Sequence, residues 1–333
     1  MLPIAVAATA LLLVACEDDD DAPAPADAAR AAIGYIPGTY VANANDFAGK
    51  AAADWDNAEV VRVELNEFSF TPNNFTFEVG KPYKVELVNV GQVKHEFTAH
   101  EFFPSVAWRK AQSNETEFKT AYIKEVEVFA GQQVDLYFVP VTPIQPVTPT
   151  AGDAETYTLV CEIEGHFKGG MFGAITVTGS TPTSPAPDYA QISEGPWVQD
   201  AAAQVEAADW DKMETIEIEL DEFSFGPNEI RLRVDQPYKL VLRNIGTVKH
   251  EFTATNFFNS VAFRKVEDAS GEFKGPTPLE IEVFPGQETE IFLIPAEKRD
   301  PPTPDIAKPE TLDLVCEIEG HLEAGMFGRI IVE

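Results

Sequence analysis

The sequence predicts an all-β protein made of two tandem Greek-key β-sandwich domains that are joined by a Pro-rich linker. Short runs in which apolar and polar residues alternate recur along the chain, and turn residues separate them. No segment shows a long apolar period of the helical kind. The second half repeats the first, element by element, which indicates two copies of one β-sandwich.

The repeat has a constant offset of 155 positions, which takes His95 to His250 and Cys161 to Cys316. The run NEFSFTPNNFTFEVGKPYKVELVNVGQVKHEF returns as DEFSFGPNEIRLRVDQPYKLVLRNIGTVKHEF without a gap. A period of this length indicates duplication of a whole domain instead of a solenoid of short repeats. The predicted divisions are a first domain at residues 33–178, a Pro-rich linker at 179–187 and a second domain at 188–333.

The first 32 residues are expected to lie outside both domains. Residues 1–16 are apolar, too short to span a bilayer, and end in a Leu-Val-Ala-Cys string that resembles the bacterial lipobox, with Cys16 as the lipid-attachment site. Its first ten residues contain no Lys or Arg, so either the signal is atypical or the true start lies upstream. Residues 17–32 are acidic and rich in Pro and Ala, as expected of a tether.

The first strand of each domain is predicted from strict alternation. Val61, Val63 and Leu65 alternate with polar residues, and the second domain repeats this pattern. The parity then changes at Phe68 and Phe70, so we expect a bulge or kink that turns both rings inward.

Later strands follow turn residues. Residues 83–87 alternate after a proline, and residues 126–138 read as two strands around a glycine turn. The last two strands are expected at 157–160 and 174–177. A short helix at 105–110, and its equivalent at 260–265, remains an alternative to irregular loop structure.

The chemistry is concentrated in one frame, C-x4-H-x4-M, which occurs as CEIEGHFKGGM and again as CEIEGHLEAGM. Each frame lies downstream of a second histidine in the string VKHEFTA. One thiolate, two imidazoles and a weak thioether are the ligands of a mononuclear copper site that transfers electrons. The predicted ligands are His95, Cys161, His166 and Met171 in the first domain and His250, Cys316, His321 and Met326 in the second.

The remaining composition excludes several other classes. Four of the five histidines are predicted ligands of the two sites, and only His100 is left. Copper oxidases and copper reductases need several more histidines to bind further copper ions. We therefore expect a protein that is not an enzyme, unless another chain supplies ligands. A net charge of −31 argues against nucleic-acid binding. The acidity fits either a basic redox partner or the general surface chemistry of a salt-adapted protein.

The pairing of HEF with CEIEGHFKGGMFG and CEIEGHLEAGMFG resembles the cupredoxins, and the C-x4-H-x4-M spacing is most similar to the auracyanin and rusticyanin branch. The resemblance implies one type 1 copper ion per domain. It also implies that His166 and His321 lie near the surface as electron ports. The apolar residues that follow them form either a docking rim or simply core, and they are Phe167, Phe172, Leu322 and Phe327.

Four residues are expected to support the ligands from a second shell, namely Asn89, Glu96, Asn244 and Glu251. For the two glutamates, a solvated carboxylate is an equally good interpretation.

These features predict an exported protein, lipid-anchored on the extracytoplasmic side of a membrane, in the periplasm or at the cell surface. It would carry or relay single electrons between redox proteins such as a cytochrome or a respiratory or photosynthetic complex. No nucleic acid and no small-molecule substrate are expected as partners. The alternative is a copper-handover lipoprotein that serves as a chaperone or in storage or resistance.

Overall fold

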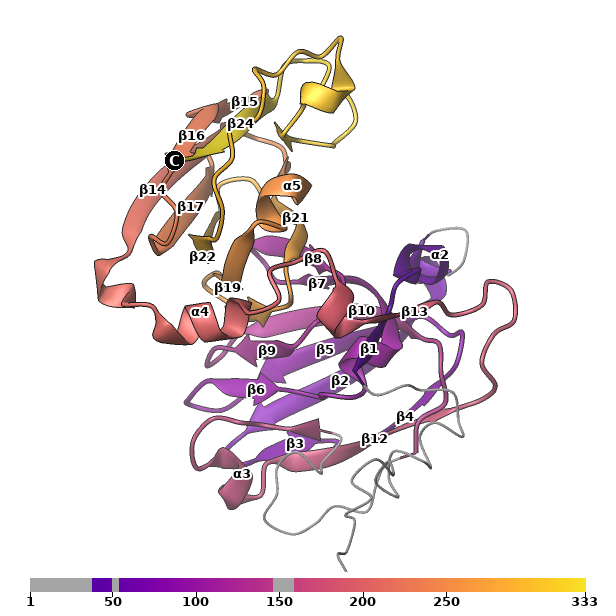
Figure 1. Cartoon of the computed structure of the whole chain (residues 1–333). Helices are drawn as coiled ribbons and strands as arrows, with labels where there is room; N and C mark the ends of the chain where they lie inside the picture. The colour runs from indigo at the N-terminus through magenta and orange to yellow at the C-terminus, as the bar shows by residue number, and fades with distance from the viewer. Residues whose placement is uncertain (1–37, 50–53, 146–158) are drawn as a thin grey trace, which may run out of the picture.

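The computed structural model describes residues 38–49, 54–145 and 159–333 (Figure 1). The predicted signal with Cys16 and the tether at 17–32 lie outside the described residues. Within those ranges the chain is built of strands with four short α-helices, so the predicted all-β class is confirmed. None of the helices in these ranges has the length and apolarity needed to cross a bilayer.

The strands of the first half begin after the short helical turn η1 (Trp55–Asn57). They are β2 (Glu59–Asn66), β3 (Ser69–Thr71), β4 (Asn74–Glu78), β5 (Tyr83–Asn89), β6 (His95–Phe97), β7 (Val106–Gln112), β8 (Thr116–Thr120), β9 (Glu125–Val128), β10 (Gln133–Pro140), β11 (Leu159–Val160) and β12 (Phe172–Thr178).

The second half repeats this order after the turn η5 (Trp210–Lys212). Its strands are β14 (Glu214–Asp221), β15 (Ser224–Gly226), β16 (Glu229–Leu232), β17 (Tyr238–Asn244), β18 (His250–Phe252), β19 (Val261–Glu267), β20 (Gly271–Lys274), β21 (Pro278–Val283), β22 (Glu288–Pro295), β23 (Leu314–Val315) and β24 (Phe327–Val332). The short pieces outside this pattern are β1 (Thr39–Val41), β13 (Tyr189–Gln191), α2 (Ala44–Ala48), α3 (His166–Gly169), α4 (Ala201–Ala207), α5 (Thr255–Phe258), η2 (Phe103–Ser105), η4 (Ile192–Glu194) and η6 (Pro309–Thr311).

Each half is a two-layer sandwich with a large and a small sheet. The small sheets have the orders β11-β12-β4 and β16-β24-β23, and the last strand of each half pairs in parallel with an early one. In the first half, Phe77 of the small sheet meets Phe138 of the large sheet edge to face, with ring centroids 5.3 Å apart. Burial of such rings between the layers supplies the hydrophobic stabilisation of the sandwich.

The two large sheets contain strands from both halves. Their orders are β18-β21-β8-β7-β10-β5-β2-β3 and β15-β14-β17-β22-β19-β20-β9-β6. Strands β8 and β9 are consecutive in the chain, yet β8 pairs with β21 and β9 pairs with β20. The strands that carry the two upstream histidines, β6 and β18, therefore each end a sheet whose greater part belongs to the opposite half.

The seam where the halves interlock is packed and hydrogen-bonded. The fully buried ring of Phe118 stacks on Phe273, with centroids 5.9 Å apart. Ser113 donates a hydrogen bond to Asp268 across the seam, at 2.6 Å. Removing such aromatic area from water stabilises the two halves as one body.

The proline-containing stretch at 179–187 leads into a segment that is fastened to the first half. Asn43 donates a hydrogen bond to the Ala186 carbonyl at 2.7 Å and accepts one from the Asp188 amide at 2.9 Å. Strand β13, which follows directly, pairs with β1.

Two local expectations are wrong. Phe70 is buried, but Phe68 is 42 % exposed, because β2 turns directly into β3 and leaves Phe68 in the turn. The equivalent Phe223 is 40 % exposed for the same reason. Residues 106–110 lie in strand β7 and not in a helix, because their apolar side chains pair across the large sheet.

Candidate metal centres

In the first half, three donor atoms from distant parts of the chain converge. His95 Nδ1 lies 3.2 Å from His166 Nδ1, and Cys161 Sγ lies 3.3 Å from the same atom. His95 is the first residue of β6, Cys161 follows β11, and His166 opens α3. Two imidazole nitrogens and one thiol sulfur that gather this closely from distant parts of the chain are the arrangement expected around a shared cation.

The cysteine loop is tightened by two left-handed glycines. Gly165 and Gly170 flank α3 at φ of +89° and +108°, a conformation that a Cβ would strain. The loop closes on itself, since the Met171 amide donates to the His166 carbonyl and the Cys161 amide donates to the Met171 carbonyl, both at 3.1 Å. Met171 is thereby held in the core with no exposed surface, on the same loop as Cys161 and His166.

The second half repeats the centre. His250, Cys316 and His321 form a group whose ligand atoms all lie within 4.8 Å of one another, and Cys316 Sγ is 3.3 Å from His321 Nδ1. The Met326 amide donates to the His321 carbonyl at 3.0 Å, and Met326 is fully buried. The structure thus brings together both predicted sets of histidine and cysteine, with each methionine on the same closed loop.

Burial sets the protonation of these groups. Desolvation raises the pKa of the Cys161 thiol to about 11, and it also raises the pKa of Cys316. Desolvation lowers the pKa values of His95, His166 and His250. The imidazoles are therefore neutral and ready to ligate, whereas the thiols need a cation to hold the thiolate form.

The donor set fits a copper ion. Neither ring nitrogen of His250 has a hydrogen-bond partner although both are buried, and such atoms are costly unless something binds them. Donors that ligate one ion at about 2.0–2.3 Å stand roughly 3–4 Å apart, as His166 Nδ1 does from His95 Nδ1 at 3.2 Å and from Cys161 Sγ at 3.3 Å. Thiolate with thioether suits Cu(I), and imidazole suits Cu(II).

The two predicted asparagines organise the loops that lead to the upstream histidines. Asn89 is buried, donates to the carbonyls of Val93 and Val128 at 2.8 and 2.9 Å, and accepts from the Gly91 amide at 2.9 Å. Asn244 makes the equivalent three bonds in the second half. These bonds fix the approach of each histidine strand to its sheet.

The two predicted glutamates are buried, so their interpretation as solvated carboxylates is wrong. Glu96 is 8 % exposed and accepts a hydrogen bond from the Glu162 amide at 3.0 Å, and its own amide points to Cys161 Sγ at 3.4 Å. In the second half, Glu251 accepts a hydrogen bond from the Glu317 amide at 3.1 Å, and its own amide points to Cys316 Sγ at 3.4 Å. Desolvation, together with neighbouring carboxylates, raises the pKa of both side chains. His100, expected at the surface, is exposed and pairs with Glu162 at 2.9 Å.

Two further residues near the first centre were not predicted as site residues. Glu67 accepts hydrogen bonds from the amides of Gln92 and Val93 at 2.6 and 3.1 Å, and its carboxylate lies 3.6 Å from His95 Nε2. Its neighbour Phe68 packs edge-on against His166, with centroids 4.9 Å apart. The recurrence of these residues in NEFSF and DEFSF was the signal that could have found them, since Glu222 and Phe223 occupy the same places.

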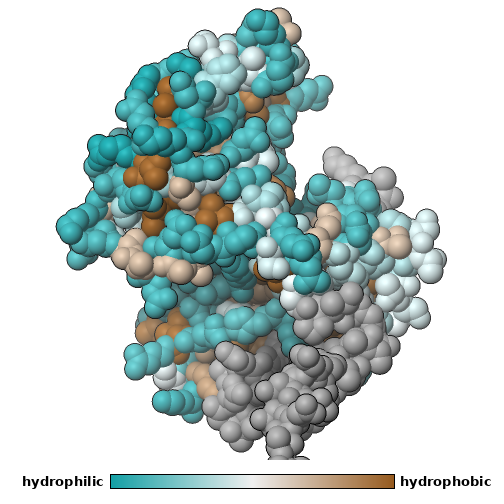
Figure 2. Space-filling view, in the orientation of Figure 1, coloured by the Kyte–Doolittle hydropathy of each residue, from teal (hydrophilic) through white to brown (hydrophobic). Residues whose placement is uncertain are grey.

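The four predicted rim residues are half-buried. Phe167 and Leu322 lie on the cysteine loops, and Phe172 and Phe327 begin the strands that follow these loops, β12 and β24. Greater apolar exposure is found at the turn before β3 and in the loop that leads to the upstream histidine. Phe68, Val90 and Val93 are each more than 40 % exposed near the first centre. The face that Figure 2 shows is mostly hydrophilic, with several separate hydrophobic patches.

No protein-family model and no curated protein matches the chain. Among solved structures, it is similar to a multicopper oxidase from Pseudomonas thermotolerans at 14 % identity and a TM-score of 0.29, over 83 % of this chain and 68 % of that one. It is also similar to a copper-containing nitrite reductase from Thermus scotoductus at 13 % identity and a TM-score of 0.27, over 83 % of this chain and 62 % of that one. Auracyanin B matches 38 % of this chain over 93 % of its own length, at 13 % identity and a TM-score of 0.24. These likenesses concern the cupredoxin-like fold.

The prediction that the chain is not an enzyme is contradicted by these matches, because multicopper oxidases and the nitrite reductase are enzymes. A count of histidines in one chain does not exclude an activity, because a site between chains can draw its ligands from both. At 13–14 % identity, the activities of those proteins are not assigned to this chain.

Proposed function

We propose that this protein binds one type 1 copper ion in each half and exchanges single electrons through the Cu(I)/Cu(II) couple. The observation that carries the proposal is the convergence of one cysteine and two histidines in a buried pocket, twice in one chain. A pocket assembled from distant strands changes little when the charge of its ion changes, and a small rearrangement favours fast electron transfer.

The positions of the two centres support contact with two separate partners. In Figure 1, β3 and α3 of the first centre lie at the bottom of the molecule, and β15 and β24 of the second centre lie at the top. Each centre has its own exposed aromatic ring against a ligand histidine, Phe68 on His166 and Phe223 on His321. We infer that electrons enter and leave through these histidine edges, with redox proteins docking on the apolar residues beside them.

The predicted export and lipid anchor belong to the same proposal. A lipid on Cys16 and an acidic tether at 17–32 would hold the two centres outside the cytoplasm, beside membrane-bound redox partners. Mass spectrometry of the protein from its native membrane tests the anchor, because an acylated N-terminal cysteine has a defined mass. A mature chain that retains residues 1–15 would contradict it.

Copper stoichiometry and absorption test the centres directly. Two copper ions per chain and an intense blue colour that reductant bleaches reversibly are expected. Cys161→Ser and Cys316→Ser should each remove about half of this absorption, and the double variant all of it, because the thiolate–copper bond is its source. Loss of all colour in one single variant would contradict two independent centres.

Retention of copper distinguishes electron transfer from copper handover. An electron carrier keeps its reduced ion, so Cu(I) should stay bound in the presence of a competing chelator while the protein cycles repeatedly between oxidation states. Rapid transfer of Cu(I) to the chelator from both centres would favour the handover function.

A further inference from the structure

Each candidate centre is linked by consecutive polar contacts to a lysine of the opposite half. At the first centre, Lys274 of β20 pairs with Glu125 of β9 at 2.5 Å, and the two residues stand directly opposite in the shared sheet. The carboxylates of Glu125 and Glu96 lie within 4.8 Å of each other. Glu96 in turn accepts the Glu162 amide at 3.0 Å and directs its own amide toward Cys161 Sγ at 3.4 Å.

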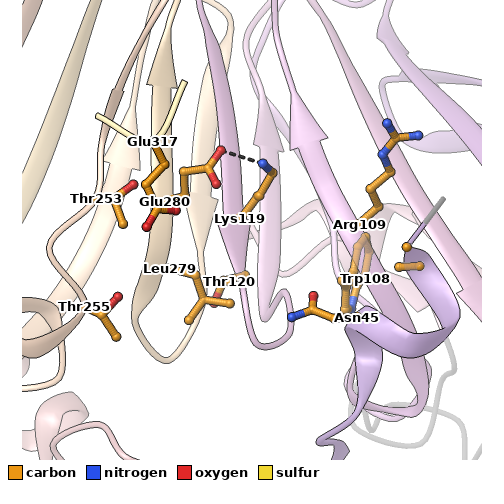
Figure 3. Close-up of a pocket in the computed structure, with 12 residues that line it drawn as sticks. Asn45, Trp108, Arg109, Lys119, Thr120, Thr253, Thr255, Leu279, Glu280 and Glu317 are labelled. Atoms are coloured by element: carbon orange, nitrogen blue, oxygen red, sulfur yellow. Dashed lines mark hydrogen bonds and ion pairs between the residues drawn. The ribbon is translucent and has the colours of Figure 1, made fainter. Parts of the chain in front are cut away.

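The second centre has the same linkage with the halves reversed. Lys119 of β8 pairs with Glu280 of β21 at 2.5 Å, again as direct cross-strand neighbours. The carboxylates of Glu280 and Glu251 lie within 4.8 Å of each other. Glu251 accepts a hydrogen bond from the Glu317 amide at 3.1 Å and directs its own amide toward Cys316 Sγ. Figure 3 shows Lys119, Glu280 and Glu317 around a cavity of about 550 Å³ at the seam.

The charges explain why a lysine is needed at this position. The carboxylates of Glu96, Glu125 and Glu127 approach within 4.8 Å of one another in a largely buried setting. Lys94 pairs with Glu127, and Lys274 pairs with Glu125. Without Lys274, the Glu125 carboxylate would stand beside Glu96 without its counter-charge, and a largely buried carboxylate without a counter-charge is costly.

We propose that Lys274 and Lys119 are positioning residues that act in trans, each holding the cysteine loop of the centre in the other half. The lysines act in the opposite half because of the mixed sheets: β20 of the second half lies beside β9 of the first, and β8 of the first half lies beside β21 of the second. Each centre is therefore complete only when both halves are assembled. The inference rests on the proposed copper centres, but the hydrogen-bonded linkage exists in the metal-free protein.

The test in the copper-loaded protein uses Lys274→Met in two backgrounds. With Cys316→Ser present, only the first centre is coloured, and with Cys161→Ser only the second. Lys274→Met is expected to lower the reduction potential of the first centre, because loss of a nearby cation favours the more positive oxidised ion. The second centre should keep its reduction potential and its electron paramagnetic resonance spectrum. Lys119→Met should lower the reduction potential of the second centre and leave the first centre unchanged.

Amide hydrogen exchange in metal-free protein tests the linkage independently of copper. Lys274→Met should speed exchange of the Glu162 amide by about tenfold, the net contribution of one hydrogen bond, and leave Glu317 unchanged. Lys274→Arg should restore protection because it keeps the charge. Lys239→Met is the matched control, since Lys239 pairs with Glu290 at 2.7 Å, outside the group of carboxylates that contact Lys274.

Equal changes at both centres, or a change in Lys239→Met as large as that in Lys274→Met, would overturn the proposal, because a general loss of stability produces both. An unchanged first centre in folded Lys274→Met protein would overturn it as well. Failure of both halves to bind copper would contradict the proposed function alone, since the exchange experiment would still report on the linkage.

Discussion

Copper binding at the first centre should tighten about tenfold for each unit of pH between 7 and 9. Burial raises the pKa of the Cys161 thiol to about 11, so only about one thiol in 10⁴ is ionised at pH 7 in the metal-free protein. Ligation requires the thiolate and therefore releases one proton. The deprotonation costs about 5 kcal/mol of binding free energy at pH 7, and each unit of higher pH recovers about 1.4 kcal/mol.

The histidines add nothing to this pH dependence of copper affinity. The pKa values of His95 and His166 are lowered by burial, so both rings are already neutral above pH 7 and release nothing on binding. The sign follows from the thiol, because its raised pKa keeps the proton on sulfur until the ion displaces it. The pKa of Glu96 is raised to about 8, so any proton that Glu96 releases when the cation binds steepens the slope with the same sign.

Anaerobic competition against a chromogenic Cu(I) chelator at pH 7, 8 and 9 measures the slope. Cys316→Ser protein isolates the first centre, and Cys161→Ser protein is the matched control, in which the thiol of Cys316 should give a slope of the same sign. A flat profile would refute the reasoning, since it would mean that the thiol is already ionised or does not ligate. A slope of two would show that a second group also loses a proton.

Three further variants probe the supports of the centres. Asn89→Ala removes three buried hydrogen bonds and should lower the free energy of unfolding by about 2–4 kcal/mol in urea titrations, as should Asn244→Ala; a loss below about 0.5 kcal/mol would contradict their structural role. Phe118→Ala should cost about 3–5 kcal/mol and weaken copper retention at both centres, because its ring packs across the seam; an effect on one centre only would count against interlocked halves. Phe68→Ser should change stability by less than about 0.5 kcal/mol yet slow electron exchange at the first centre in stopped-flow measurements, and an unchanged rate would place the port elsewhere.

Much of the fold could be predicted because its signals are local. Alternation in residues 59–66 follows from the two-residue period of a strand, and the structure confirms a strand there. The glycine turn within residues 126–138 also lies between two strands, with Gly131 in the left-handed region. Phe68 was misplaced because alternation does not reveal where one strand turns into the next.

The glutamates show a second limit. Sequence spacing placed Glu96 beside a ligand, but it could not tell whether the carboxylate faces water. The answer depends on Glu162 and on Glu125, which lie 66 and 29 positions away in the chain and reach Glu96 only through folding. Burial of a polar side chain is decided by such long-range partners.

The sequence by itself determined the duplication, the strand periodicity and the composition of both candidate centres, because rare ligand residues at equal intervals are readable without a structure. Only the tertiary structure decided that β8 and β9 enter different sheets, and that a lysine of one half faces the cysteine loop of the other. The physical reason is that strand pairing is set by side-chain packing between distant segments, and two halves with the same strand order offer each edge strand two similar partners.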